Sequence, residues 1–198
     1  MEKRKKIPTR EEYRQTVARL TEEKNIDALV ALRMTCELGV TRLELANIKN
    51  TDLDRINKRG VWIEVAKHIR RRKQKTKRKP MMEMRQREIP VNTGLYQLLI
   101  SYMDTKNQVF ILKRHVGDHT KPFTPRNINK IFYDAGIPWS PHKSRHYFKN
   151  QVKDWMRENR VMDDELIKDY LGHKKTTTES YGSLSWDYKL EVIDKVFE

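Results

Sequence analysis

The stretch WSPHKSRH at residues 139–146 predicts the helix start around which the rest of the chain is organised. Ser140 can cap a helix, and Pro141 already has the backbone φ angle of a first helical turn. His142 and Arg145 stand at i and i+3, so both side chains lie over that turn, where unpaired amides and the helix dipole favour an anion. The pattern therefore predicts a phosphate-binding site.

Two more residues suited to phosphate chemistry follow on the next elements. Asp163 can cap a second helix, and Gly172 would end it, because glycine readily adopts the left-handed conformation of a helix C-cap. His173 then lies just past the helix end, and Tyr181 falls on a further short helix. The segment 140–181 thus places four such residues on three successive short elements.

The order and spacing of these residues resemble the signature of the tyrosine recombinases, the phage integrase-like family, whose catalytic fold is related to that of the type IB topoisomerases. The signature reads HKSR at residues 142–145, LGH at 171–173, and then Tyr181. The resemblance covers nearly the whole chain, and its specificity lies in the order of the motifs. Two features depart from the family pattern. The interval between LGH and the tyrosine is one residue shorter, and Ser144 replaces the usual leucine.

A further arginine lies near position 41, where residues 41–44 form a capping box after a helix that Gly39 ends. Arg42 therefore stands in the first turn of the next helix, which suits phosphate binding. The resemblance gives the family's first catalytic arginine to this region, although strict alignment through Gly39 and Glu44 puts Thr41 at its place. We assign the role to Arg42, with a one-residue shift. The alternative is that Arg42 is an exposed structural residue.

A β-hairpin is predicted between these two regions. Residues 61–69 alternate as a strand does, and residues 82–91 can pair with them across the basic segment 70–79. This resembles the family's hairpin, in which a catalytic lysine protonates the departing 5′ oxygen, and Lys75 matches that lysine best. The hairpin is longer than usual, which leaves three other candidates: Lys73, Lys77 and Lys79. Apart from one such lysine, the segment reads as a solvated, phosphate-seeking tract.

The remaining patterns predict a mainly helical α+β fold in which this hairpin is the small antiparallel sheet. Apolar residues at helical spacing, with capping signals, predict further helices at residues 9–24, 27–38, 95–102 and 124–135. The resemblance implies the catalytic fold shared by tyrosine recombinases and type IB topoisomerases. Cys36, the only cysteine, is expected in the core and excludes an internal disulfide or a zinc cluster of cysteines.

The charge of the chain favours a polyanionic partner. Its 198 residues include 42 lysines and arginines against 27 acidic residues, and 42 − 27 gives a net charge of +15. No apolar run approaches the ~20 residues that span a bilayer, and the basic start lacks the apolar region of a secretory signal. We therefore expect an intracellular protein, in the cytoplasm or nucleoid of a prokaryotic host.

Cleavage of a phosphodiester requires that charge be neutralised and a proton supplied. The sequence has no convincing carboxylate cluster for magnesium and no phosphate-cradling glycine loop, which leaves arginines. Arg42 and Arg145 could bind the non-bridging oxygens, and His142 and His173 add donors or a proton acceptor. By resemblance, Tyr181 is the nucleophile, the product is a 3′-phosphotyrosyl bond, and neither a metal nor another cofactor is expected.

The resemblance implies a site-specific recombinase that integrates viral genomes or mobile elements and acts on double-stranded DNA as a homo-oligomer, a tetramer. We expect residues 1–198 to form one catalytic domain after a basic tail at 1–6, without the separate N-terminal DNA-clamping domain of most family members. An apolar stripe predicts a helix at 184–198 that docks on a neighbouring protomer or on its own domain. Two alternatives stay open: a type IB topoisomerase-like activity that relaxes DNA, and a DNA-binding module whose catalytic site has decayed.

Overall fold

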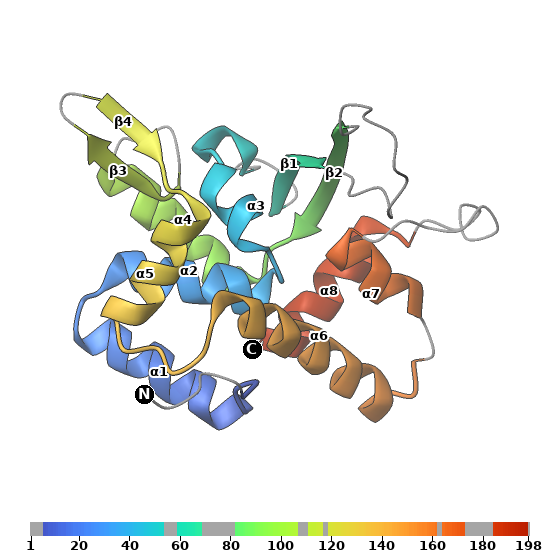
Figure 1. Cartoon of the computed structure of the whole chain (residues 1–198). Helices are drawn as coiled ribbons and strands as arrows, with labels where there is room; N and C mark the ends of the chain where they lie inside the picture. The colour runs from blue at the N-terminus through green and yellow to red at the C-terminus, as the bar shows by residue number, and fades with distance from the viewer. Residues whose placement is uncertain are drawn as a thin grey trace, which may run out of the picture.

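Helices dominate the computed structural model of the chain, and small antiparallel hairpins lie beside them (Figure 1). The structure describes residues 6–53, 59–68, 82–106, 111–116, 119–161, 164–172 and 184–197. This architecture confirms the predicted α+β fold. The sequence patterns missed the short hairpin formed by β3 (Lys113–Val116) and β4 (His119–Pro122).

Helix α2 (Ile26–Glu37) lies at the centre of the fold. It is buried along nearly its whole length, as expected for a helix that is apolar on every side. Cys36 is fully buried within it, as predicted. The helices that pack around α2 are α1 (Arg10–Glu22), α3 (Arg42–Asn47), α4 (Thr93–Lys106), α5 (Pro125–Asp134) and α6 (Pro141–Glu158).

The predicted capping boxes at the starts of α1 and α3 are both present. The Thr9 hydroxyl accepts from the Glu12 amide at 3.1 Å, and the Glu12 carboxylate accepts from the Thr9 amide at 2.7 Å. Between α2 and α3 the chain turns at Gly39, whose φ is +60°. A β-carbon there would lie 2.6 Å from a ring carbon of Phe148, so both the backbone angle and the close approach require glycine.

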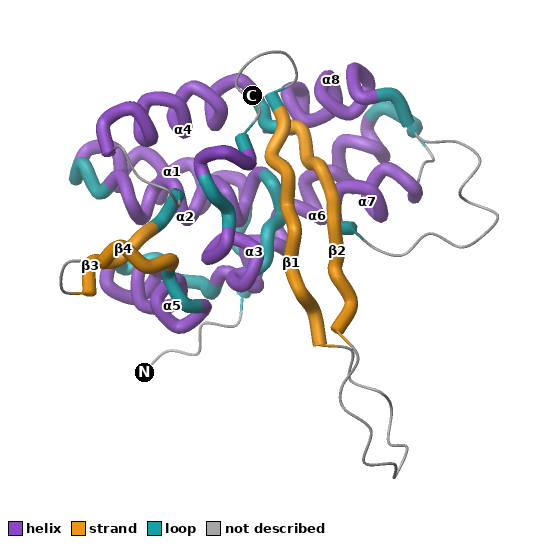
Figure 2. Tube along the Cα trace, turned by 90° about the horizontal axis from the view of Figure 1, so that it is seen from above, coloured by secondary structure: helices purple, strands orange, loops and turns teal. Residues whose placement is uncertain are grey.

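The predicted long hairpin is confirmed within one residue at each end. Strand β1 (Gly60–His68) pairs antiparallel with β2 (Met82–Pro90), in a register that sets Gly60 opposite Pro90. A one-turn 3₁₀ helix, η1 (Asn50–Asp52), precedes it. Figure 2 shows the hairpin running between α3, next to β1, and α7 (Asp164–Leu171), next to β2.

The last helix, α8 (Trp186–Phe197), packs on α6 and β2 of its own chain. It buries Val192, Ile193 and Val196, and an ion pair of 2.7 Å joins Asp194 to Arg59. The predicted apolar stripe is therefore covered within the single chain. Docking of this helix on a neighbouring protomer remains a prediction.

Candidate functional site

Helix α6 begins at Pro141, as predicted, but the Ser140 side chain does not cap it as the sequence pattern suggested. Ser140 takes the N-cap position, yet its side chain makes no capping hydrogen bond, and only its carbonyl accepts from the amides of Lys143 and Ser144. The Ser144 side chain is fully buried and accepts from the indole nitrogen of Trp139 at 3.1 Å. The serine at the family's usual leucine position is therefore paired, as a buried hydroxyl must be.

Arg145 joins α6 to two segments that are far from it in the sequence. Its guanidinium donates to the Gly39 carbonyl in the α2–α3 turn and, at 2.9 Å, to the Leu171 carbonyl at the end of α7. The same group lies 3.6 Å from a carboxylate oxygen of Glu44 in α3. The structure thus brings the predicted arginine of α6 against the segment of the first predicted arginine and against the turn that precedes His173.

Glu44 is the centre of this cluster. Its Oε2 accepts from the Thr41 amide at 2.6 Å, which completes the capping box of α3, and forms a 2.9 Å ion pair with Arg87. Burial raises the pKa of the Glu44 carboxyl, but Arg87, the Thr41 amide and Arg145 together outweigh burial and hold that pKa below its ordinary value. Glu44 is therefore ionised at neutral pH and links the two guanidinium groups.

Arg87 is a member of the cluster that sequence reasoning missed. It lies near the end of β2, with a side chain that is only 7% exposed, and it donates to the Tyr170 carbonyl in the last turn of α7. A signal was present in the strand pattern. In this part of the hairpin Ile89 is buried and Glu88 is not, so alternation puts Arg87 on the buried face, where a charge needs a partner.

The histidines of α6 lie on the outer part of the same helix. His142 is exposed, and its Nε2 lies 3.0 Å from Nε2 of His146, with the two rings edge to face. Burial foremost, and then the proximity of His142 and of the basic side chains of Lys143, Lys149 and Arg145, lower the pKa of His146. The His146 ring is therefore neutral at pH 7, and its Nε2 can either accept a hydrogen bond from His142 or donate one to it, depending on the tautomer.

Of the other predicted site residues, the structure describes only Arg42. Arg42 takes the first position of α3, as predicted, but its side chain is exposed and forms no hydrogen bond or ion pair with the residues that the structure describes. Lys75, His173 and Tyr181 lie outside the described residues, as do the alternative lysines. Their roles remain predictions.

Three of the described tyrosines are unsuited to attack a phosphate. Burial, above all other causes, raises the pKa of Tyr13, Tyr147 and Tyr170 above the ordinary value for a phenol. Attack requires the phenolate, so a raised pKa makes these side chains poor nucleophiles. Tyr133, in contrast, is 68% exposed on α5.

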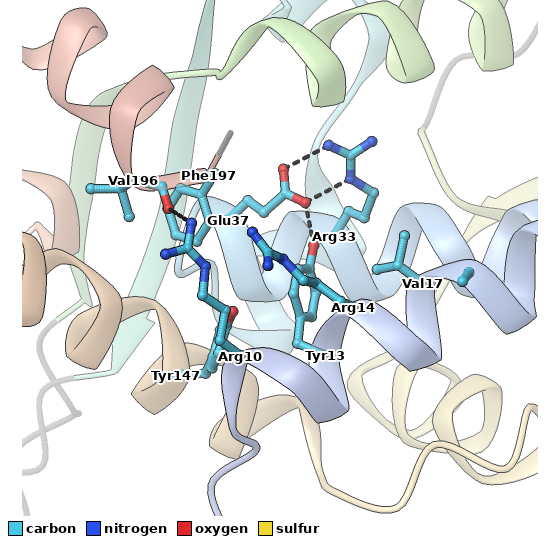
Figure 3. Close-up of a pocket in the computed structure, with 10 residues that line it drawn as sticks. Arg10, Tyr13, Arg14, Val17, Arg33, Glu37, Tyr147, Val196 and Phe197 are labelled. Carbon is cyan, nitrogen blue, oxygen red and sulfur yellow. Dashed lines mark hydrogen bonds and ion pairs between the residues drawn. The ribbon is translucent and has the colours of Figure 1, made fainter.

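A pocket of about 320 Å³ lies on the other side of α6 (Figure 3). Tyr147 lines it, and because Tyr147 follows Arg145 by two residues, the two side chains leave α6 on roughly opposite sides. The Glu37 carboxylate at the pocket is bound by Arg33 at 2.6 Å and by Asn92 at 2.6 Å. This buried pair resembles the Arg87–Glu44 pair in chemistry but is separate from the predicted site.

Among the described residues, no three histidine, cysteine, aspartate or glutamate side chains lie close enough together to hold a metal ion. Nor is any helix in the described ranges long and apolar enough to cross a bilayer.

Comparisons with known proteins agree with the fold. The model of the phage integrase family matches residues 8–185. The integrase of mycobacterium phage Brujita superposes with a TM-score of 0.64 at 14% identity, over 100% of this chain and 61% of that one. The lambda integrase catalytic core superposes with a TM-score of 0.54 at 15% identity, over 85% of this chain and 91% of that one.

A lambda integrase tetramer bound to a Holliday junction is also similar, with a TM-score of 0.56 at 15% identity, over 91% of this chain and 48% of that one. The chain thus spans about half to three fifths of the longer integrases. At these identities the likeness shows the fold alone. None of the curated proteins matches the chain.

Proposed function

Since this chain belongs to the phage integrase family, the tyrosine recombinases, we propose that it cleaves and rejoins double-stranded DNA through a 3′-phosphotyrosyl intermediate. The observation that supports this most is the position of Arg145. Its guanidinium joins α6, which carries the HKSR motif, to the end of α7 at Leu171, in the LGH motif, and to the turn at Gly39 that precedes Arg42. A preorganised cation at this junction can stabilise the negative charge of the transition state in phosphodiester cleavage.

In the proposed reaction the phenolate of Tyr181 attacks the scissile phosphorus. A bond forms between the tyrosine oxygen and phosphorus, and the bond from phosphorus to the 5′ oxygen breaks. Arg145 and Arg42 neutralise the non-bridging oxygens, with His142 and His173 as further donors or a proton acceptor. A lysine of the β1–β2 connection, Lys75 by resemblance, gives the departing 5′ oxygen its proton.

Religation is the reverse of this step and needs no ATP, because the phosphotyrosyl bond retains the energy of the phosphodiester. When a different 5′ hydroxyl attacks, the strands are exchanged, and this distinguishes recombination from relaxation of supercoils. We propose that the chain acts as a homo-oligomer on DNA, by analogy with the lambda integrase tetramer on a Holliday junction. The net charge of +15 supports binding to the DNA backbone.

We propose that residues 1–198 correspond to the catalytic domain, because they match the lambda integrase catalytic core over 91% of its length. A second candidate function is a DNA-binding module that has lost its chemistry. Two observations favour it: Thr41, at the strict position of the first arginine, serves as the cap of α3, and Arg42 is exposed without a partner among the described residues.

One experiment separates the two. The protein is incubated with a library of nicked duplexes that are randomised around the nick, so that cleavage releases a short oligonucleotide and traps the covalent adduct. We expect a protein–DNA band that resists SDS, and mass spectrometry should locate the DNA on the Tyr181 peptide. Tyr181→Phe should abolish the band and retain DNA binding, whereas Tyr133→Phe, which alters an exposed tyrosine, should leave it unchanged. DNA binding without any adduct from the unmodified protein would favour the binding module.

A further inference from the structure

Two arginines hold the last carbonyls of α7. Arg87 donates to the Tyr170 carbonyl, and Arg145 donates to the Leu171 carbonyl at 2.9 Å. The final carbonyls of a helix have no partner within the helix, and the negative end of its dipole attracts cations. The two guanidinium groups therefore fix the end of α7, and the residue that follows this end, after Gly172, is His173.

The same two arginines share one carboxylate oxygen. Oε2 of Glu44 lies 2.9 Å from the Arg87 guanidinium and 3.6 Å from that of Arg145. Their side chains are 7% and 17% exposed, so solvent screens this triad weakly. Removal of Arg87 would break the shorter of the two ion pairs. Glu44 would then keep only the longer ion pair, with Arg145.

Gly172 adds a steric constraint to this electrostatic one. Its φ is +62°, and a β-carbon on it would lie 2.5 Å from Cδ of Arg87. The chain therefore leaves α7 directly over the Arg87 side chain. The Arg87 side chain therefore limits where the backbone of Gly172, the residue before His173 in the sequence, can lie.

We propose that Arg87 is a positioning residue for DNA cleavage, one that sets both the guanidinium of Arg145 and the position of Gly172 at the end of α7. This inference rests on the proposed cleavage reaction. Arginine suits the role because its planar fork serves the Glu44 carboxylate and the Tyr170 carbonyl together, whereas lysine offers a single point charge. Arg87 itself need not touch the DNA.

The test compares Arg87→Gln and the milder Arg87→Lys with a matched control, Arg33→Gln. Arg33 forms an ion pair with Glu37 outside the predicted site, and the two pairs are buried to a similar degree. The side chains of Arg33 and Glu37 are 18% and 3% exposed, and those of Arg87 and Glu44 are 7% and 15% exposed. Adduct formation is measured in single turnover at saturating protein, at a temperature where circular dichroism shows each variant folded. DNA affinity and thermal midpoint are measured in parallel.

A second substrate separates positioning from general destabilisation. A methylphosphonate at the scissile position lacks the non-bridging charge, so its cleavage needs less help from a guanidinium. If Arg87 acts through Arg145, the loss of rate caused by Arg87→Gln should be smaller on this neutral substrate, as it should be for Arg145→Ala. A defect of folding would slow both substrates equally.

We expect Arg87→Gln to slow cleavage of the normal substrate at least 10-fold and to leave DNA affinity nearly unchanged. This is less than the ~10²-fold loss expected when a charge stabiliser itself is removed, because Arg87 acts through Arg145. Arg87→Lys should lie between this variant and the unmodified protein, and Arg33→Gln should lower the thermal midpoint without slowing cleavage. Equal rates for Arg87→Gln and Arg33→Gln, or equal defects on the two substrates, would overturn the proposal. Failure of the unmodified protein to form any adduct would instead overturn the proposed function.

Discussion

Replacement of Glu44 by glutamine should destabilise the fold far more than the same change at Glu12. Both residues stand at the third position of a helix and close a capping box, with Thr41 and Thr9 respectively. Glutamine can also close such a box, so the capping energy is largely retained in both variants. What differs is the environment. Glu44 is 15% exposed and paired with two arginines, whereas Glu12 is 43% exposed beside Lys6.

The magnitude follows from this difference. Removal of one partner from a buried ion pair costs about 3–5 kcal/mol, because the remaining charges stay buried without compensation. For a chain of this size each kcal/mol corresponds to about 2–4 °C, so the thermal midpoint should fall by roughly 6–20 °C. At the solvated position of Glu12, the change should stay within about 0.5 kcal/mol.

Urea unfolding followed by circular dichroism, across a range of pH, measures both the size and the origin of the effect. The pKa of Glu44 is lower in the folded protein than in the unfolded chain, so its contribution is complete above the unfolded value of about 4.3 and is lost as pH falls through the folded pKa. The difference between the unmodified protein and Glu44→Gln should therefore be largest near neutral pH and shrink in acid. Equal losses for Glu44→Gln and Glu12→Gln, or a difference independent of pH, would refute the central role of this carboxylate.

Other predictions concern the DNA reaction. Arg145→Ala should slow adduct formation at least ~10²-fold in single-turnover assays, the scale for removal of one preorganised charge stabiliser. Arg42→Ala should do the same if this exposed side chain closes on the phosphate, and near-normal cleavage by that variant would assign the first arginine's role elsewhere. DNA affinity measured by fluorescence anisotropy should fall about 10³-fold between 50 and 200 mM salt, as for roughly six phosphate contacts. A shallow salt slope would contradict a broad backbone contact.

The features predicted correctly from the sequence depend on residues within one or two helical turns of each other. The capping box at Thr41 and Glu44 needs only residues three apart, and it is present as predicted. The helix end at Gly172 depends on the backbone freedom of one residue, which has the expected positive φ. Each strand of the long hairpin follows from alternation between neighbouring residues, although alternation alone does not fix which residues of the two strands pair.

Only the tertiary structure decided how these pieces form a site. The capping pattern explains why Glu44 faces its own helix start, but not that its carboxylate also binds Arg87 and Arg145, which lie 43 and about 100 positions away in the chain. Likewise, Ser140 has the residue type of a helix cap, yet its side chain does not cap α6. Local propensity restricts the backbone of a few neighbouring residues. The pairing of buried charges depends on which segments the packed core brings together, and no short-range pattern contains that information.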